Sequence, residues 1–387
     1  MNDTILELRK FIAPEFVFGI DALDLTGQYA RNYGGKKALV VTDSGVAEAG
    51  WTKKVVESLI EKNIKVEIYS KVSQNPREDE VMEGAELYRT SGCNLIVAVG
   101  GGSPIDCAKG IGIVVANSRH ILEFEGVDQI NNPIPPLICV PTTGGTSADV
   151  SQFSIITDQK EKVKISIVSK AIIPDISLID PQTLLTMDNY LTACTGIDAM
   201  VHAFEAYVSN ASSAMTDMHA LKAIEILAKY LIPSLQEPNN LEYRSQVMFA
   251  SLEAGLAFSN ASLGVVHSMA HSLGGLLDLP HGECNALLFN HVINYNFSEA
   301  EEKYVNLARI FNIDFTKMTA PEKKSALFNL IQSFREKAGI TDSLNTRGVK
   351  TGDIPPLAKK ALADVCSVTN PRRPVQRDIE VIYEEAL

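Results

Sequence analysis

Short apolar runs that each end in a turn constrain the fold of this chain more than any other feature. They occupy residues 37–42, 65–69, 94–99 and 136–140. Stretches with apolar residues at helical spacing, such as residues 80–91, lie between them. Continuous apolar strands that alternate with helices are typical of a parallel sheet covered on both faces. We therefore expect an α/β domain over residues 1–185.

The second half of the chain has a different pattern. Strand patterns fade after residue 185, and residues 192–209, 215–235 and 241–258 carry apolar residues at helical spacing. These segments are rich in Ala, Leu and Met. A chain of 387 residues is also too long for one small core. We therefore expect residues 186–387 to form a second, all-helical domain.

The composition argues against several classes of protein. The 47 acidic residues outnumber the 35 basic residues, for a formal net charge of -12. A negative field repels phosphate backbones and anionic lipids, so we expect no nucleic-acid partner and no membrane partner. No apolar run approaches the roughly 20 residues that span a bilayer, and no signal peptide is evident. The 6 cysteines form no C-x-x-C pair, which favours a reducing, cytoplasmic location.

Two glycine-containing loops follow the last two apolar runs. Gly100-Gly101-Gly102-Ser103 precedes an expected helix, whose N-terminal N–H groups and dipole favour an anion such as pyrophosphate. A tight turn without a ligand explains this loop alone equally well, and its spacing matches neither G-x-G-x-x-G nor Walker A. The second loop, residues 141–147, adds hydroxyl groups and two further glycines. Because the carboxyl ends of parallel strands meet at one edge, the two loops together predict a nucleotide site.

Asp43 stands at the end of the first apolar run. A carboxylate at this position accepts hydrogen bonds from a ribose 2′-hydroxyl and repels a 2′-phosphate, which favours NAD over NADP. An aspartate that caps the turn or helix at Ser44-Gly45 is an equally good interpretation of the sequence.

Histidines and one aspartate recur at helical spacing in the second half of the chain. Asp198 and His202 are four residues apart, and His267 and His271 repeat that spacing. Residues four apart lie on one face of a helix. One such pair is usually explained by capping or packing, but two pairs followed by His281 favour a divalent metal site for Fe(II), Zn(II) or Mn(II). A nucleotide site combined with a metal centre indicates hydride transfer, with the metal as a Lewis acid on an alcohol or carbonyl oxygen.

These motifs together resemble the group III iron-dependent alcohol dehydrogenases, which include methanol, butanol and 1,3-propanediol dehydrogenases. The resemblance extends from the strand that ends at Asp43 to residues 363–374. The motifs that carry it are residues 100–106, residues 141–146, residues 195–199 and the stretch with three histidines. It implies a Rossmann-like parallel-sheet nucleotide domain followed by a helical metal-binding domain, as in dehydroquinate synthase, with the active site in the cleft between them.

The resemblance also implies roles for individual residues. The implied metal ligands are Asp198, His202, His267 and His281. His271 is then not a ligand but a catalytic residue near the nicotinamide and the substrate, where it relays a proton. The implied cofactor-binding residues are Asp43, Asn75, Gly101, Gly102, Ser103, Asp106, Thr142, Thr143, Thr146 and Lys164. Lys109, like Asp106, is expected to orient the cofactor.

The activity implied by the resemblance is that of an NAD-dependent dehydrogenase, which interconverts small primary alcohols or diols and their aldehydes. Family members form homo-oligomers from dimers to decamers. Dehydroquinate synthase, a lyase of the same fold, is an alternative, but apolar residues such as Met269 and Leu273 near the histidines do not suit its phosphorylated substrate. A zinc hydrolase is disfavoured because no H-E-x-x-H pattern occurs, and a nucleotide-binding protein without activity is disfavoured by the intact ligand positions.

Overall fold

The computed structural model of the chain describes residues 10–387. These residues divide into two compact units, Ile12–Met187 and Asp188–Leu387, and Lys10 and Phe11 belong with the second. The first unit is an α/β structure and the second is helical, which confirms the expected fold class. The change of unit falls at Asp188, whose carboxylate caps the first long helix by accepting from the backbone N–H of Leu191 at 2.8 Å. The Phe11 ring stacks on His219 of the helical unit, with 5.5 Å between the ring centroids.

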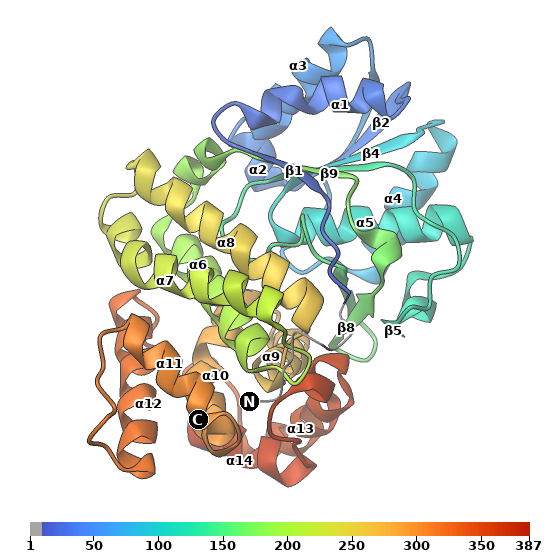
Figure 1. Cartoon of the computed structure of the whole chain (residues 1–387). Coiled ribbons are helices and arrows are strands. Elements are labelled where there is room, and N and C mark those ends of the chain that lie inside the picture. Colours follow the sequence, from blue (N-terminus) through green and yellow to red (C-terminus); the bar gives the residue numbers. More distant parts are fainter. Residues whose placement is uncertain (1–9) are drawn as a thin grey trace. The chain divides into compact units, whose positions relative to one another are not determined.

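The first unit is built on a six-stranded sheet in which every pairing is parallel (Figure 1). The strand order is β1-β9-β6-β4-β2-β3. The strands are β1 (Glu15–Phe18), β2 (Lys37–Val41), β3 (Lys65–Tyr69), β4 (Leu95–Gly100), β6 (Leu137–Pro141) and β9 (Ile176–Ile179). The four apolar runs of the sequence are thus β2, β3, β4 and β6. Every residue of β4 and β6 is buried, as a strand covered on both faces requires.

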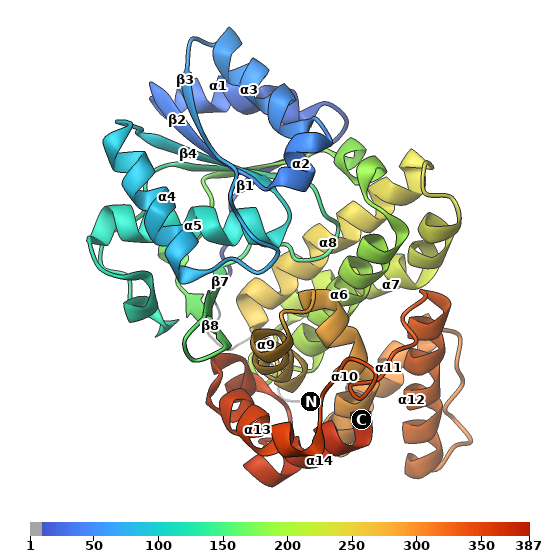
Figure 2. The same cartoon turned by 180° about the vertical axis from the view of Figure 1, so that it is seen from behind.

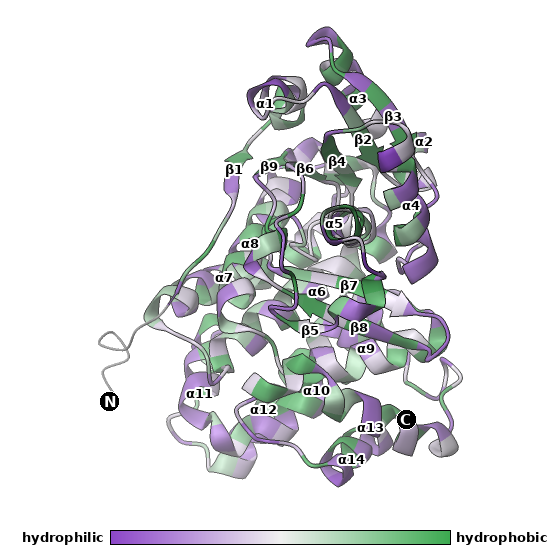
Figure 3. Ribbon diagram, turned by 90° about the vertical axis from the view of Figure 1, so that its right-hand side faces the viewer, coloured by the Kyte–Doolittle hydropathy of each residue, from purple (hydrophilic) through white to green (hydrophobic). Residues whose placement is uncertain are grey.

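Helices cover both faces of this sheet (Figure 2). The helices of this unit are α1 (Thr26–Asn32), α2 (Ser44–Glu48), α3 (Trp51–Glu61), α4 (Glu78–Thr90) and α5 (Gly102–Asn117). Ala38 and Val40 of β2 pack with α1 and α3, whereas Leu39 and Val41 pack with α4 and α5. Successive residues of one strand therefore lie in two different cores, which explains why the strand has no polar face. Figure 3 shows the strongly hydrophobic colouring of α5, which is buried along most of its length.

A second, three-stranded sheet was not predicted from the sequence. It consists of β5 (Gly126–Val127), β7 (Phe153–Asp158) and β8 (Val163–Val168), and β7 pairs antiparallel with β8. The β7–β8 hairpin contacts the loop after β3, where the backbone N–H of Thr157 donates to Pro76 O at 2.8 Å. This hairpin is short and partly exposed, and its sequence lacks the continuous apolar run that marked β4 and β6.

The helical unit contains the longest helices of the chain. They are α6 (Asn189–Val208), α7 (Ala214–Gln236), α8 (Leu241–Ala261), α9 (Val265–Leu277), α10 (His281–Asn296), α11 (Glu301–Ile310), α12 (Ala320–Lys337), α13 (Ile354–Ala363) and α14 (Gln376–Ala386). Short 3-10 turns of this unit lie at Phe297–Glu299, Thr351–Asp353 and Val365–Thr369, and those of the α/β unit lie at Ala22–Leu25, Ile121–Phe124, Lys170–Ile172 and Pro181–Thr186. Within residues 10–387 no single helix is long and apolar enough to cross a membrane. The helices α8 and α9 meet this requirement only when taken together, and the pair is bent by 101°.

Candidate metal centre and cofactor loops

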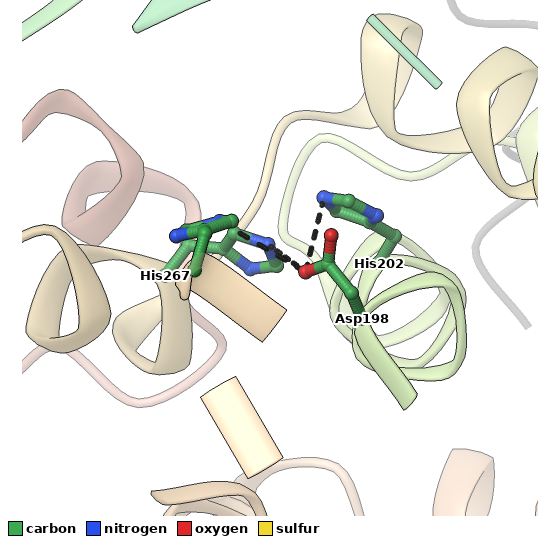
Figure 4. Close-up of side chains that lie close together, drawn as sticks. Asp198, His202 and His267 are labelled. Carbon is green, nitrogen blue, oxygen red and sulfur yellow. Dashed lines mark ion pairs between the residues drawn. The ribbon is translucent and has the colours of Figure 1, made fainter. Parts of the chain in front are cut away.

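Four predicted ligand residues from three helices meet at one point of the helical unit. Asp198 and His202 lie on α6, His267 lies on α9 and His281 begins α10. One potential ligand atom from each lies within 4.8 Å of the others. Asp198 Oδ1 lies 3.9 Å from the Nε2 atoms of His202 and His281 and 3.7 Å from that of His267. Figure 4 shows the Asp198 carboxylate between the rings of His202 and His267.

Close packing of α10 on α6 brings His281 into this group. A Cβ on Gly282 would lie 2.3 Å from Cys194 O and 3.2 Å from Asp198 Cβ, so only glycine allows the two helices to approach this closely. His202 is one turn after Asp198 on α6, on the same face, as the spacing predicted.

The electrostatics of the group favour a bound cation. Burial raises the pKa of Asp198, but His202, His281 and His267 outweigh this effect and hold that pKa well below its usual range. Burial lowers the pKa of His267, but its hydrogen bonds to Asp198 and Glu205 outweigh burial and raise it to about 9. Asp198 Oδ2 is also buried without a hydrogen-bond partner among residues 10–387. One carboxylate and three imidazoles around such an orphaned oxygen fit a divalent first-row metal ion.

Asn285 lies among these side chains and was not predicted. Its Nδ2 atom lies 2.6 Å from Asp198 Oδ1, 3.1 Å from His267 Nε2 and 3.2 Å from His281 Nε2. Asn285 is four residues after His281 on α10, so the same spacing argument that found the histidines could have found it.

His271 stands apart from the four-residue group. Its ring stacks on that of His281 with 5.2 Å between centroids, and its Nδ1 atom lies 2.8 Å from Asp364 Oδ2. Burial raises the pKa of Asp364, but the charge of His271 and the hydrogen bonds to the carboxylate outweigh it and lower that pKa. Asp364 was not predicted from the sequence, because 93 residues separate it from His271.

Three of the predicted cofactor residues lie where the strand order of the sheet reverses. The chain passes from β2 outward to β3 and then crosses back to β4 on the other side of β2. Open α/β sheets bind ligands outside the carboxyl ends of the strands at such a reversal. Asp43 directly follows β2, and Gly101 and Gly102 directly follow β4.

The glycine loop and the threonine loop contact each other, as the sequence predicted. The backbone N–H of Thr142 donates to Gly100 O at 2.9 Å. A Cβ on Gly101 would lie 2.8 Å from Thr143 Cγ2, and a Cβ on Gly102 would lie 3.0 Å from the Cγ2 atom of Thr146. A side chain at either glycine would press against a threonine of the neighbouring loop.

Four further predicted residues lie around these loops. Ser103 Oγ donates to Gln74 O, next to Asn75. Lys164 Nζ on β8 donates to Asn75 Oδ1 at 2.7 Å, and both side chains are buried. Burial raises the pKa of Asp106 to about 7, although Lys109 and Lys164 oppose this effect.

Comparison with known proteins identifies the chain. The family model described as iron-containing alcohol dehydrogenase matches residues 13–181. The model of the C-terminal part of the Fe-containing alcohol dehydrogenase family matches residues 192–387. The chain belongs to the iron-containing alcohol dehydrogenase family. It is an oxidoreductase of the alcohol–aldehyde class, as the sequence motifs predicted, and the lyase and hydrolase alternatives are not supported.

Individual relatives match this iron-containing alcohol dehydrogenase over nearly their full length. It is 38% identical to the 1,3-propanediol dehydrogenase of Klebsiella pneumoniae, over 95% of this chain and 96% of the relative. It is 33% identical to the NAD-dependent methanol dehydrogenase of Bacillus methanolicus, over 97% of this chain and 99% of the relative. The crystal structure of a 1,3-propanediol oxidoreductase matches with a TM-score of 0.94 and 37% identity, and covers 98% of this chain and 100% of that one.

Two residues of this alcohol dehydrogenase have structural roles. Lys109 is fully buried and donates to Ala148 O, Ser151 O and Phe153 O at 2.6, 2.8 and 2.7 Å. An ammonium group has three donors, so none is left for a direct contact with a cofactor, and Lys109 instead anchors the segment after the threonine loop. Asp43 Oδ1 accepts from the backbone N–H of Val46 at 2.9 Å and so caps α2, which confirms the capping interpretation. The Oδ2 atom of the same carboxylate takes no part in this hydrogen bond.

Proposed function

We propose that this protein is an NAD-dependent dehydrogenase of small primary alcohols or diols that also reduces the corresponding aldehydes. The observation that carries the proposal is the convergence of Asp198, His202, His267 and His281, which we propose as ligands of Fe(II), with Zn(II) or Mn(II) as alternatives. When bound, the ion supplies Lewis acidity toward the alcohol oxygen and NAD supplies the hydride acceptor.

The residues around the metal centre support a small, apolar substrate. The ring of Phe258 stacks on that of His202 with 4.3 Å between centroids. An apolar ring at this position offers no hydrogen bond to a phosphate or carboxylate group. His271 is proposed to move the hydroxyl proton, with its ring oriented by the contact between its Nδ1 atom and Asp364.

The α/β unit is proposed to hold NAD. The free N–H groups at the start of α5, with Gly101, Gly102 and Ser103, suit the pyrophosphate. Thr142, Thr143 and Thr146 are proposed to lie around the nicotinamide half, with Asn75, Asp106 and Lys164 as further contacts. The Oδ2 atom of Asp43 is proposed to accept from the adenosine ribose.

A reconstitution experiment tests the proposal as a whole. The protein is stripped of metal, reloaded anaerobically with Fe(II), Zn(II), Mn(II) or no metal, and given NAD with a panel of short alcohols and diols. We expect NADH to form only after metal loading, with a rate that depends on the length of the alcohol. A preparation that binds metal and NAD but produces no NADH from any alcohol would contradict the proposed reaction.

The assembly and location are part of the same proposal. We propose a cytoplasmic homo-oligomer between a dimer and a decamer. All six cysteines are buried free thiols, which suits a reducing compartment. Light scattering on the purified protein measures the subunit number, and a monomer would contradict this part of the proposal.

Substitution of Asp43 by asparagine should improve the use of NADP. The carboxamide keeps an oxygen for the cap of α2 but removes the charge that repels a 2′-phosphate, and we expect kcat/KM for NADP to rise about tenfold, or about 1.4 kcal/mol. Asp188→Asn is the matched control, because it makes the same change at the cap of α6. Unchanged NADP kinetics in Asp43→Asn would contradict the ribose contact.

Substitution of Gly101 by alanine should weaken NAD binding. The new methyl group would lie 2.8 Å from Thr143 Cγ2 and must displace the Thr143 side chain. Overpacking of this kind costs about 1–3 kcal/mol, so we expect the NAD affinity to fall at least about tenfold in a fluorescence titration with NADH. Gly352→Ala is the control, since nothing lies within 4 Å of the added methyl group there. Equal affinities in the two variants would argue against cofactor binding at this loop.

A further inference from the structure

The first turn of α9 depends on side chains from distant parts of the chain. The N-terminal N–H groups of a helix have no partner within the helix. Glu205 on α6 accepts from Gly264 N at 3.0 Å with Oε2 and from Val266 N at 2.7 Å with Oε1. Asn370 Oδ1 accepts from Val265 N at 3.2 Å. The start of α9 is therefore tied to α6, the helix that carries two of the proposed ligands.

The same carboxylate holds the ring of His267. Glu205 Oε2 lies 2.6 Å from His267 Nδ1. Because the two carboxylate oxygens already accept from Gly264 N and Val266 N, the His267 Nδ1 atom is the donor. With Nδ1 held by Glu205, the other ring nitrogen, Nε2, faces Asp198 and lies 3.7 Å from Asp198 Oδ1.

The surroundings of Glu205 are built for a carboxylate. Its side chain is only 4% exposed, and a buried carboxylate is costly unless it is hydrogen-bonded. A Cβ on Gly264 would lie 2.8 Å from Glu205 Oε1 and 2.8 Å from Asn370 Oδ1, so the absence of a side chain at position 264 makes room for both acceptors. Glu205 also follows Asp198 and His202 on the same face of α6.

We propose that Glu205 is a positioning residue of the metal centre. It fixes the tautomer of His267 and the position at which α9 starts against α6, and so directs His267 Nε2 toward the Asp198 carboxylate. This inference rests on the proposed role of the four-residue group as a metal site. Carboxylates that orient a metal-bound histidine typically contribute about 10–100-fold to metal affinity.

Glu205→Gln tests the proposal in the full-length protein with Co(II) as the probe. Glutamine keeps the length of the side chain but cannot accept from His267 and from two backbone N–H groups at once. We expect the Co(II) affinity, measured by competition with a chelator, to fall about 10–100-fold, and the visible absorption bands of bound Co(II) to change. Glu253→Gln is the matched control, because Glu253 Oε2 also lies 2.6 Å from the Nδ1 atom of a histidine, His219, and its affinity should equal that of the wild type.

Two further variants separate positioning from capping and from misfolding. Asn370→Ala removes the contact with Val265 N but none with His267, so it should lower the melting temperature and leave Co(II) affinity unchanged. Gly264→Ala displaces the Glu205 carboxylate without replacing it, and should weaken Co(II) binding at least about tenfold even if Glu205→Gln does not fold.

The outcomes separate this inference from the proposed function. Wild-type affinity in Glu205→Gln or Gly264→Ala would overturn the role of Glu205, and so would an equal loss in Asn370→Ala. A wild-type protein that fails to bind Co(II) would instead overturn the metal site on which the proposed function depends.

Discussion

His267→Ala is expected to lose bound metal and activity together. The substitution removes one of the four proposed ligands and leaves the buried carboxylate of Glu205 without its ring partner. A Lewis-acidic ion contributes several kcal/mol to a reaction of this kind, and about 1.4 kcal/mol corresponds to tenfold in rate. We therefore expect kcat/KM for the alcohol to fall about 10³-fold or more. Elemental analysis and NADH formation in one preparation measure both losses.

A surface histidine provides the control for this experiment. His120 is exposed and caps the short turn Ile121–Phe124 in the α/β unit, so His120→Ala should keep both metal and activity. A His267→Ala enzyme that turns over alcohol at the wild-type rate with no metal in the preparation would refute the proposed Lewis-acid role.

His271→Ala is expected to keep its metal and lose about 10²-fold or more in kcat near neutral pH, the contribution typical of a positioned proton-transfer group. His271 lies outside the four-residue group and is held through Nδ1 by Asp364. Steady-state kinetics and metal content measure the two quantities separately. Added imidazole should restore part of the rate, because it supplies the missing proton acceptor without repairing any packing defect.

The control for His271→Ala is His219→Ala, which also removes an imidazole paired with a carboxylate. It should retain the wild-type kcat. Metal loss in His271→Ala would show that this residue belongs to the ligand set, and a rate unaffected by the substitution would exclude it from proton transfer.

The parts of this structure that sequence could predict are those fixed by local spacing. The strands β4 and β6 are buried on both faces, so their sequences are continuously apolar and each is followed by a glycine-containing loop. Asp198 and His202 lie one helical turn apart, which places both on one face of α6. The α/β class, the two glycine-containing loops and the pairing of Asp198 with His202 therefore follow from patterns of a few residues.

The supporting residues could not be predicted, because their roles depend on contacts between distant segments. Glu205 and His267 are 62 residues apart, and neither the spacing nor the composition indicates that α9 starts beside Glu205. For Lys109, the sequence predicts a role that the structure does not support. A lysine next to a glycine-rich loop suggests a cofactor contact, yet the fold brings three carbonyl oxygens around it and buries it completely.

The assignment of Phe11 to the helical unit makes the α/β unit an insertion within it. The chain enters residues 12–187 from the helical unit and returns to it at Asp188. A chimaera that exchanges cofactor preference between relatives therefore needs two junctions, one before residue 12 and one after residue 187. A single crossover near residue 185 would separate Phe11 from its stacking partner His219 and leave a foreign N-terminal segment on the recipient.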